Sequence, residues 1–125
     1  MIYEIVNKPK KIEPILLDTA VSFACSYLQL NVDFVLEFDS LKRHQCGLCD
    51  YDEDEIVIFI AKRLSPQNVI RTLFHELVHV KQHHTGRLGY NKVWEGVVYD
   101  CEYADRPWEI EAYDLEEKMM KAFYG

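Results

Sequence analysis

Several features are absent from this sequence, and each absence excludes a class of protein. The 125 residues contain no apolar run of 18 or more, the length that a transmembrane helix requires. The N-terminal residues MIYEIVNKPKK lack the basic and then apolar layout of a signal peptide, so we expect a cytoplasmic protein. The four cysteines are too few and too irregularly spaced for a disulfide scaffold, so we expect reduced thiols.

Basic residues are also in the minority. The chain has 14 Lys and Arg residues against 21 Asp and Glu residues, a formal net charge of -7. Nucleic-acid backbones and anionic membranes require a basic surface, so we expect neither as a partner, whereas cationic or neutral substrates are compatible with this balance. Hydrophobic residues make up 49% of the chain, which is enough for the core of one globular domain. No feature indicates an oligomeric state.

The pattern of apolar residues predicts an α+β domain with the element order β-α-β-β-α-α. Residues 2–6, 32–38 and 55–61 are rich in β-branched and aromatic residues and are predicted strands. The last of these is a nearly continuous apolar run, which indicates at least partial burial on both faces. Residues 39–54 and 86–104 have no clear period and are predicted loops.

Helices are predicted at both ends of the chain. Residues 13–30 repeat apolar residues at spacings of three and four, which predicts a buried face made of Ile15, Leu16, Ala20, Phe23, Ala24, Tyr27 and Leu28. The last helix is predicted from Asp105 as N-cap to about Phe123, with Pro107 in its first turn. Its predicted buried stripe is Trp108, Ala112, Leu115, Met119 and Ala122.

The middle helix has the clearest boundaries in the chain. Ser65 is a good N-cap and Pro66 suits the first helical position. The helix is predicted to run to about Thr85, where Gly86 provides a left-handed C-cap. An H-E-x-x-H motif lies inside this helix, as residues 75–79.

The spacing of this motif has a chemical meaning. Residues four apart lie on one face of a helix, so His75 and His79 can both reach one zinc ion. Glu76 is rotated away from His75 by about 100°, so it flanks the metal without ligating it. From there Glu76 can act as general base and take a proton from a water that the metal has made more acidic.

A catalytic zinc site needs a third protein ligand and one open position. The three-histidine pattern of the metzincins would place a histidine at position 85, but Thr85 excludes that class. His83 lies one further turn along the helix, about 6 Å from the site along the axis, and we expect His83 and His84 to form a solvated C-terminal turn. The remaining source of a ligand is a carboxylate on the last helix.

The motif HELVH, followed by residues 106–112 (RPWEIEA), resembles the gluzincins, zinc peptidases whose third ligand is a glutamate on a second helix. The short chain and the RPWEIEA segment are similar to small metallopeptidases of bacteriophages and bacteria. The resemblance is specific over residues 65–85 and 105–117 and is not visible over the first 50 residues. It implies a single zincin-like domain over residues 1–125 with one zinc ion per chain.

The resemblance favours Glu109 as the third ligand, because the family often has Ala three residues after this glutamate and Ala112 fits. Glu111 stays open as an alternative; otherwise it caps, forms a salt bridge or lines the cleft. The family often has Asp or Asn four residues after the ligand, but this sequence has Tyr113 there. The usual contact to a ligand histidine is then expected from Asp114 or Asp105.

The resemblance also suggests roles around the zinc. A Tyr, His or Arg stabilises the oxyanion in such enzymes, and the candidates, which the sequence does not rank, are Tyr90, Tyr99, Tyr103 and Arg106. Residues 55–61 resemble the strand that borders gluzincin clefts and pairs with an extended substrate.

Two further clusters have simpler interpretations. His44, Cys46 and Cys49, beside Asp50, form an H-x-C-x-x-C arrangement, but one C-x-x-C without a second pair is more often an ordinary loop. The acidic run Asp50, Asp52, Glu53, Asp54 and Glu55 is interpreted as a solvated loop surface.

The sequence therefore predicts a zinc metallopeptidase that hydrolyses a peptide or protein substrate. Glu76 is the predicted catalytic residue, and His75, His79 and Glu109 are the predicted metal ligands. Two alternatives stay open. One is an inactive or latent protein that uses the fold to bind a partner, with Phe123 and Tyr124 folded into the cleft. The other is a protein whose zinc is purely structural.

Overall fold

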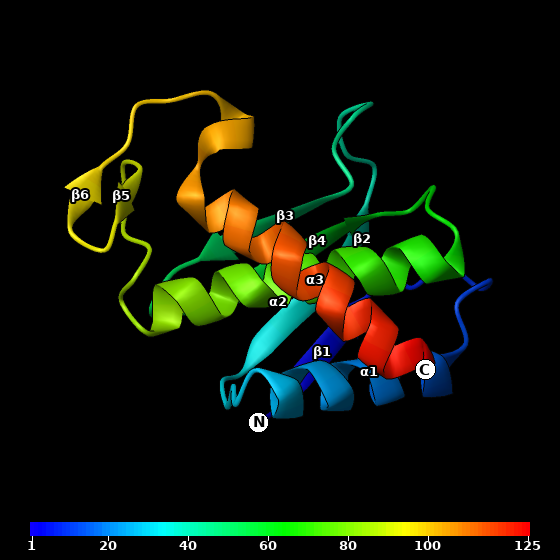
Figure 1. The fold of residues 1–125 in the computed structure, drawn as a ribbon. Helices are drawn as coiled ribbons and strands as arrows, with labels where there is room; N and C mark the ends of the chain where they lie inside the picture. The colour runs from blue at the N-terminus through cyan, green and yellow to red at the C-terminus, as the bar shows by residue number, and fades with distance from the viewer.

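A computed structural model describes residues 1–125 and confirms the α+β class. The main sheet has the strand order β1-β2-β4-β3, in which β1, β2 and β4 are parallel and β3 runs antiparallel at one edge (Figure 1). Its strands are β1 (Tyr3–Val6), β2 (Phe34–Asp39), β3 (Gly47–Tyr51) and β4 (Ile56–Ala61). A separate antiparallel pair consists of β5 (Val93–Trp94) and β6 (Val97–Val98).

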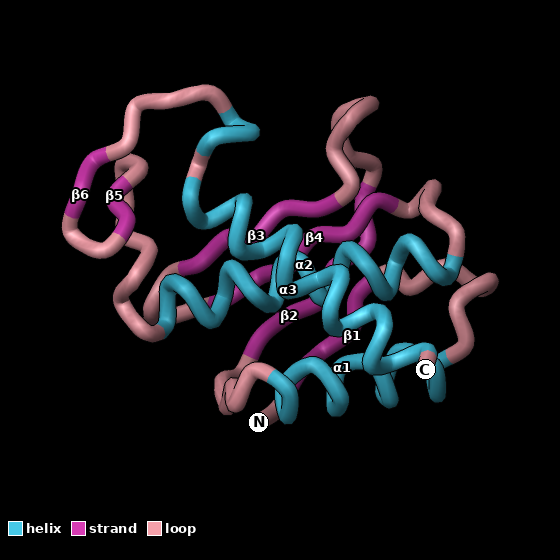
Figure 2. Tube along the Cα trace, in the orientation of Figure 1, coloured by secondary structure: helices cyan, strands magenta, loops and turns pink.

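Three helices cover one face of this sheet (Figures 1 and 2). They are α1 (Pro14–Tyr27), α2 (Pro66–His84) and α3 (Pro107–Tyr124), and a short 3-10 turn, η1 (Tyr103–Asp105), precedes α3. Helix α2 is the central one, because it contacts β3, β4, α1 and α3. None of the three is both long and apolar enough to cross a membrane.

The core lies between the sheet and the helices. Alternate residues of β2 and β4 point into it and are buried, namely Phe34, Leu36, Phe38, Ile56, Ile58 and Ile60. Their neighbours Val35, Val57 and Phe59 are half-buried on the other face, so the predicted partial burial of both faces is confirmed. Helix α2 contributes the largest share of helical core residues and is buried along most of its length.

The predicted boundaries of α2 are confirmed. Ser65 is the N-cap, and its side chain accepts a 3.4 Å hydrogen bond from the Asn68 N–H, while Pro66 occupies the first helical position. The helix ends at His84, and Gly86 takes the left-handed conformation with φ of 78°. The two histidines and the glutamate of the motif are therefore held on a well-defined helix.

The loop predictions were wrong in two places. Residues 47–51 form the edge strand β3, and the segment 86–104 contains β5, β6 and the start of η1. The N-cap of α3 is Arg106 rather than Asp105, which belongs to η1. Among the predicted buried residues, Ile15, Tyr27 and Ala122 are exposed.

The strand order also corrects the position of the strand expected to pair with a substrate. Strand β4 lies between β2 and β3, so both of its edges are already hydrogen-bonded. Strand β3 is the edge strand beside α2. Any segment that adds to the sheet on this side must therefore pair with β3.

Candidate metal centre

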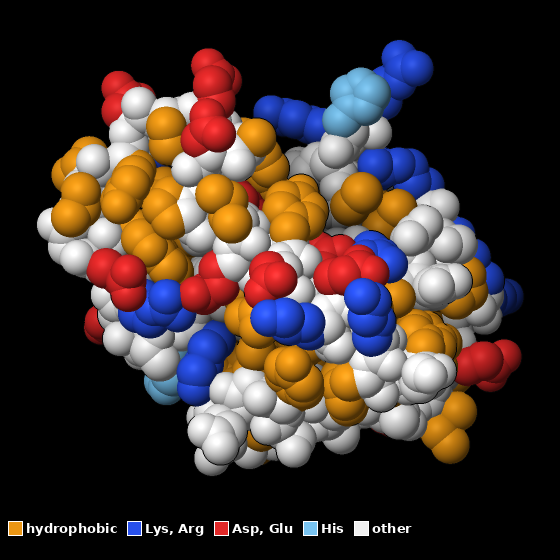
Figure 3. All heavy atoms as spheres, viewed as in Figure 1, with side chains coloured by type: hydrophobic (Ala, Val, Ile, Leu, Met, Phe, Trp, Pro, Cys, Tyr) orange, Lys and Arg blue, Asp and Glu red, His pale blue; other side chains and the backbone are white.

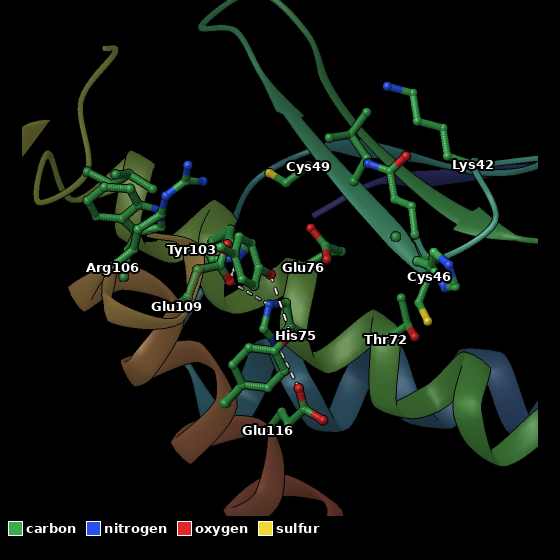
Figure 4. Close-up of a pocket in the computed structure, with 18 of the residues that line it drawn as sticks. Lys42, Cys46, Cys49, Thr72, His75, Glu76, Tyr103, Arg106, Glu109 and Glu116 are labelled. Atoms are coloured by element: carbon green, nitrogen blue, oxygen red, sulfur yellow. Dashed lines mark hydrogen bonds and ion pairs between the residues drawn. The ribbon is translucent and has the colours of Figure 1, made fainter. Parts of the chain in front are cut away.

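A cavity of about 930 Å³ opens between α2, β3, the loop before β3 and the start of α3 (Figure 4). Residues of the H-E-x-x-H motif form its floor, and residues 42–49 form one wall. Tyr103, Arg106 and Trp108 belong to the opposite side. The cavity brings together segments that are separated by more than 50 residues in the sequence.

The structure brings His75, His79 and Glu109 together on the floor of this cavity. The Oε1 atom of Glu109 lies 2.9 Å from His75 Nε2 and 3.0 Å from His79 Nε2. One potential ligand atom from each residue lies within 4.8 Å of the others, and the chain has no other such group of metal-binding side chains. This buried group can bind a metal ion, as the sequence predicted for these three residues.

Electrostatics in this group are dominated by the two histidines and the carboxylate between them. Burial alone lowers the pKa of His75, but hydrogen bonds to Glu109 and Glu116 raise it to about 9. The pKa of His79 is raised as well, against its burial, by Glu109 and Glu76. Burial disfavours the charged form of Glu109, yet the two imidazoles lower its pKa to about 2. A metal ion therefore competes with protons for the same nitrogen atoms.

Both histidines are oriented through their second ring nitrogen. Glu116 Oε1 accepts a 2.8 Å hydrogen bond from His75 Nδ1, and Gln82 Oε1 accepts one of the same length from His79 Nδ1. Each Nε2 atom is thereby directed at Glu109 and the cavity. Such contacts fix the ring orientation that a metal-binding histidine needs, so the residues present fit a metal ion.

The sequence prediction missed Glu116 and Gln82. Asp114 and Asp105, which were expected in this role, are exposed, and Asp114 pairs with Lys118 instead. Glu116 lies seven residues after Glu109, so two turns of α3 place both carboxylates on the face toward α2. Gln82 likewise lies seven residues after His75, on the same face of α2. The seven-residue spacing from a predicted ligand could therefore have indicated both residues.

Tyr113, at the position where the gluzincin pattern often has Asp or Asn, packs against the metal group instead of hydrogen bonding to it. Its ring centroid lies 4.5 Å from that of His75, at an interplanar angle of 54°. The ring thus limits the rotation of His75 from the side of α3, while Glu116 holds Nδ1.

Glu76 faces the cavity beside the metal group (Figure 4). Its side chain is buried, at 6% exposure, but it forms no hydrogen bond or ion pair with another residue. Burial raises the pKa of Glu76, and the two nearby imidazoles oppose this shift. A buried carboxylate without a protein partner has its hydrogen-bonding capacity available to a molecule in the cavity.

Glu111 is not part of the metal-binding group. Its carboxylate accepts hydrogen bonds from Arg87 at 2.7 and 3.0 Å and from Gln82 Nε2 at 3.1 Å. Gln82 Nε2 also donates to the Trp108 carbonyl at 3.0 Å. Because both amide hydrogens are used in this way, the Gln82 oxygen is left to face His79. Glu111 therefore forms the salt bridge that was one of its predicted alternatives.

Two of the four candidates for oxyanion stabilisation lie at the cavity and two do not. Tyr103 and Arg106 line the cavity, whereas Tyr90 and Tyr99 do not. The Tyr103 hydroxyl lies 3.4 Å from the Tyr113 hydroxyl. Burial and the Tyr113 contact raise the pKa of Tyr103, so its phenol keeps its proton at neutral pH.

The remaining candidates are placed outside the metal-binding group. His83 and His84 were expected to be solvated. His84 is exposed, but His83 is half-buried: its ring stacks on Tyr51 at a centroid distance of 5.0 Å, and its Nδ1 donates to the Leu88 carbonyl. His44, Cys46 and Cys49 form no metal-binding group, and the four cysteines are free. The acidic run at the β3–β4 turn is exposed, as predicted.

Comparison of the chain with protein-family models, with curated proteins and with solved structures gives no match. A functional assignment therefore depends on the chemistry of the cavity and on the motif residues that form it.

Proposed function

We propose that the chain is a zinc-dependent hydrolase of peptide bonds, in which His75, His79 and Glu109 hold the metal and Glu76 is the general base. The observation that carries this proposal is the position of Glu76. It is a buried carboxylate with no protein partner, directed into a cavity whose floor is the one metal-binding group of the chain. A purely structural metal site has no need of such a residue.

The ligand set supports zinc as the metal. Two imidazole nitrogens and one carboxylate oxygen form a known ligand set of catalytic zinc sites, which leave one position open. When bound, zinc acts as a Lewis acid and increases the acidity of water in the cavity. The resemblance of HELVH and RPWEIEA to the gluzincins points to the same metal and the same class of enzyme.

Glu76 moves the proton in the proposed reaction. Its carboxylate takes a proton from the attacking water as the new C–O bond forms at the substrate carbonyl. The same oxygen then gives this proton to the amide nitrogen as the C–N bond breaks, so that the leaving group departs as a neutral amine. The raised pKa of Glu76 supports both transfers, because a carboxylate that holds a proton briefly must not be too weak a base.

Tyr103 is the residue best placed to stabilise charge on the substrate oxygen. Its protonated hydroxyl lies at the cavity, 3.4 Å from the Tyr113 hydroxyl and close to the Glu109 carboxylate of the metal-binding group. A phenol that keeps its proton at neutral pH can donate to a developing oxyanion. Arg106 also lines the cavity.

The edge strand β3 supports an extended peptide as substrate. Residues 45–49 line the cavity, and β3 has a strand partner only on the side of β4. A peptide that adds to this edge gains backbone hydrogen bonds without any requirement for particular side chains. Strand β3 takes over the role that the sequence had suggested for residues 55–61.

The structure does not favour the latent alternative in its predicted form. Phe123 packs on Phe23 and Phe74, with ring centroids 5.2 and 5.6 Å away, and neither Phe123 nor Tyr124 lines the cavity. Truncation after Ala122 would remove a contact of the core and is expected to destabilise the fold rather than to release activity.

Metal content and peptide hydrolysis, measured together, test the proposal. The purified chain should bind one zinc ion and cleave members of a mixed peptide library, with cleavage sites identified by mass spectrometry. A chelator should abolish cleavage and added zinc should restore it. Glu109→Gln should lose zinc, whereas the matched variant Glu111→Gln should keep it in stoichiometric amount. Zinc bound equally by both variants, or cleavage that survives removal of the metal, would refute the proposal.

A further inference from the structure

The charge of the cavity outside the metal centre is opposite in sign to that of the whole chain. The acidic residues that line the cavity are Glu76, Glu109 and Glu116, and all of them belong to or adjoin the metal-binding group. The Lys and Arg residues of the lining, Lys42, Arg43 and Arg106, all lie outside it. A chain with a net charge of -7 thus presents cations where a substrate would extend beyond the metal.

Arg106 has an unusual environment for an arginine of this chain. Its Nε atom is fully buried without any hydrogen-bond partner, and no other fully buried side-chain nitrogen or oxygen atom is in this state; the Glu76 oxygens, by contrast, are accessible from the cavity. The guanidinium lies over the rings of Tyr103 and Trp108, at 5.4 and 5.9 Å from their centroids, which hold it in position. Leaving a buried donor unpaired is unfavourable, so this donor is suited to an acceptor that arrives with a ligand.

Three arginines outside the cavity lining already have partners. Arg71 pairs with Glu116 and Glu117, and Arg87 pairs with Glu111 and Glu95. Arg63 donates to the carbonyls of Arg43 and Gln45. Arg43 is also unpaired but is exposed, so Arg106 is the one partly buried arginine without a hydrogen-bond partner.

The opposite wall of the cavity is also basic. Lys42, Arg43 and His44 lie on the loop between β2 and β3, where basic side chains gather in Figure 3. Their side chains form no ion pair, and Arg63 supports the loop through its two backbone hydrogen bonds. In Figure 4, Lys42 and Arg106 lie on opposite sides of Glu76. A peptide that passes Glu76 therefore meets a cation on each side.

We propose that the substrate is a peptide segment with acidic side chains on both sides of the bond that is cleaved. Arg106 binds one carboxylate, for which a planar guanidinium is well suited, and Lys42 with Arg43 attracts the other. This inference depends on the proposed hydrolase function and adds a substrate class to it. The net charge of the whole chain was compatible with cationic or neutral substrates, and the charges that line the cavity favour an acidic one instead.

Three sets of internally quenched peptides test the charge preference on the zinc-loaded full chain. The sets have the same sequence around a central bond, except that the flanking positions carry Glu, Gln or Lys. We expect kcat/KM to fall about tenfold from Glu to Gln and further to Lys, and the difference to narrow as salt screens the charges. Equal kcat/KM for the three sets, or a preference for Lys, would overturn the inference while leaving the hydrolase proposal intact.

Variants identify the residue responsible. Arg106→Gln should lower kcat/KM for the Glu peptides about tenfold more than for the Gln peptides, mainly through KM. Lys10→Gln, which removes an exposed cation outside the cavity, is the matched control and should lower kcat/KM for both sets equally or not at all. An equal effect of Arg106→Gln on both sets would exclude Arg106 as the carboxylate-binding residue and overturn the assignment.

Binding without turnover separates this inference from the hydrolase proposal. Fluorescence anisotropy measures the affinity of the zinc-loaded Glu76→Gln variant for the same labelled peptides. Tighter binding of the Glu peptides supports the inference even if the parent cleaves nothing, in which case only the hydrolase proposal fails. Equal or undetectable binding of all three peptide sets overturns the inference of an acidic substrate.

Discussion

The Oε1 atom of Glu116 lies 2.8 Å from His75 Nδ1, in a hydrogen bond between two side chains that are each less than 10% exposed. The other oxygen of Glu116 accepts a 3.1 Å hydrogen bond from Arg71. The carboxylate thus links the half-buried cation of Arg71 to a metal-binding imidazole, and it directs the Nε2 atom of that imidazole toward Glu109.

This arrangement predicts that Glu116→Gln weakens zinc binding. Loss of the negative charge removes the charge-assisted contact that orients His75 and makes it a better ligand, so we expect the zinc Kd to rise about 10- to 100-fold. Competition with a chromophoric chelator measures this change. Glu117→Gln is the matched control, because Glu117 also pairs with Arg71 but is exposed and does not contact His75. A Kd that both substitutions change equally would assign the effect to Arg71 rather than to His75.

The metal-free protein should have a characteristic dependence of stability on pH. His75 has a pKa of about 9 in the folded chain, above its ordinary 6.5, so it binds its proton more tightly when folded. Its contribution is complete below pH 6.5 and is lost as the pH rises through 9. The pKa of Glu109 is lowered from 4.5 to about 2, so its contribution is complete above pH 4.5 and is lost as the pH falls through 2.

Both contributions are complete between pH 4.5 and 6.5. We expect the melting temperature of the chelator-treated chain to be higher in this range than above pH 9. His75→Gln should make the alkaline decrease smaller, because the group that loses its proton is gone. A melting temperature that rises as the pH increases from 6.5 to above 9 would show that the histidine–glutamate cluster does not stabilise the metal-free state. A decrease at alkaline pH that His75→Gln retains in full would show the same.

Gly47 determines how closely β3 approaches α2. A Cβ atom at this position would lie 2.5 Å from Thr72 Cγ2 and 3.1 Å from Glu76 Cγ. Gly47→Ala should therefore destabilise the chain by roughly 1–3 kcal/mol, measured by chemical denaturation, and should displace Glu76. Gly89→Ala is the matched control, because the nearest atom to its added Cβ is at 3.5 Å. The addition of Thr72→Ser, which removes Cγ2, should recover part of the lost stability; no recovery would mean that the clash with Thr72 is not the cause.

The sequence predicted the elements whose signals are local. Ser65, Pro66 and Gly86 define α2 through capping and backbone preferences that act within a few residues, and the structure confirms them. Strand β3 was missed because GLCDY has a glycine and an aspartate among only five residues, and the strand forms by pairing with β4. The two-residue strands β5 and β6 have still less local signal.

The residues of the candidate site also differ in whether a local sequence pattern predicts them. His75, Glu76 and His79 are predictable because a single helix sets their spacing. Glu109 depends on how α3 packs against α2, which periodicity does not reveal, and the sequence reached it through a family resemblance while Glu111 stayed open. Glu116 and Gln82 were missed because each contacts a ligand histidine instead of the metal. Glu116 on α3 contacts His75 on the facing helix, and Gln82 contacts His79 on its own helix. The free guanidinium of Arg106 depends on the whole cavity, so no sequence pattern indicates it.

The most direct test of the proposed function is the hydrolysis of a cleaved library peptide by Glu76→Gln, with zinc content measured on the same sample. Glu76 is adjacent to the metal-binding group but is not a member of it, so the variant should still bind one zinc ion per chain. Its kcat should fall by at least about 100-fold, because the group that transfers the proton is lost. A zinc-loaded Glu76→Gln chain that cleaves the peptide at the rate of the parent would contradict the assignment of Glu76 as general base.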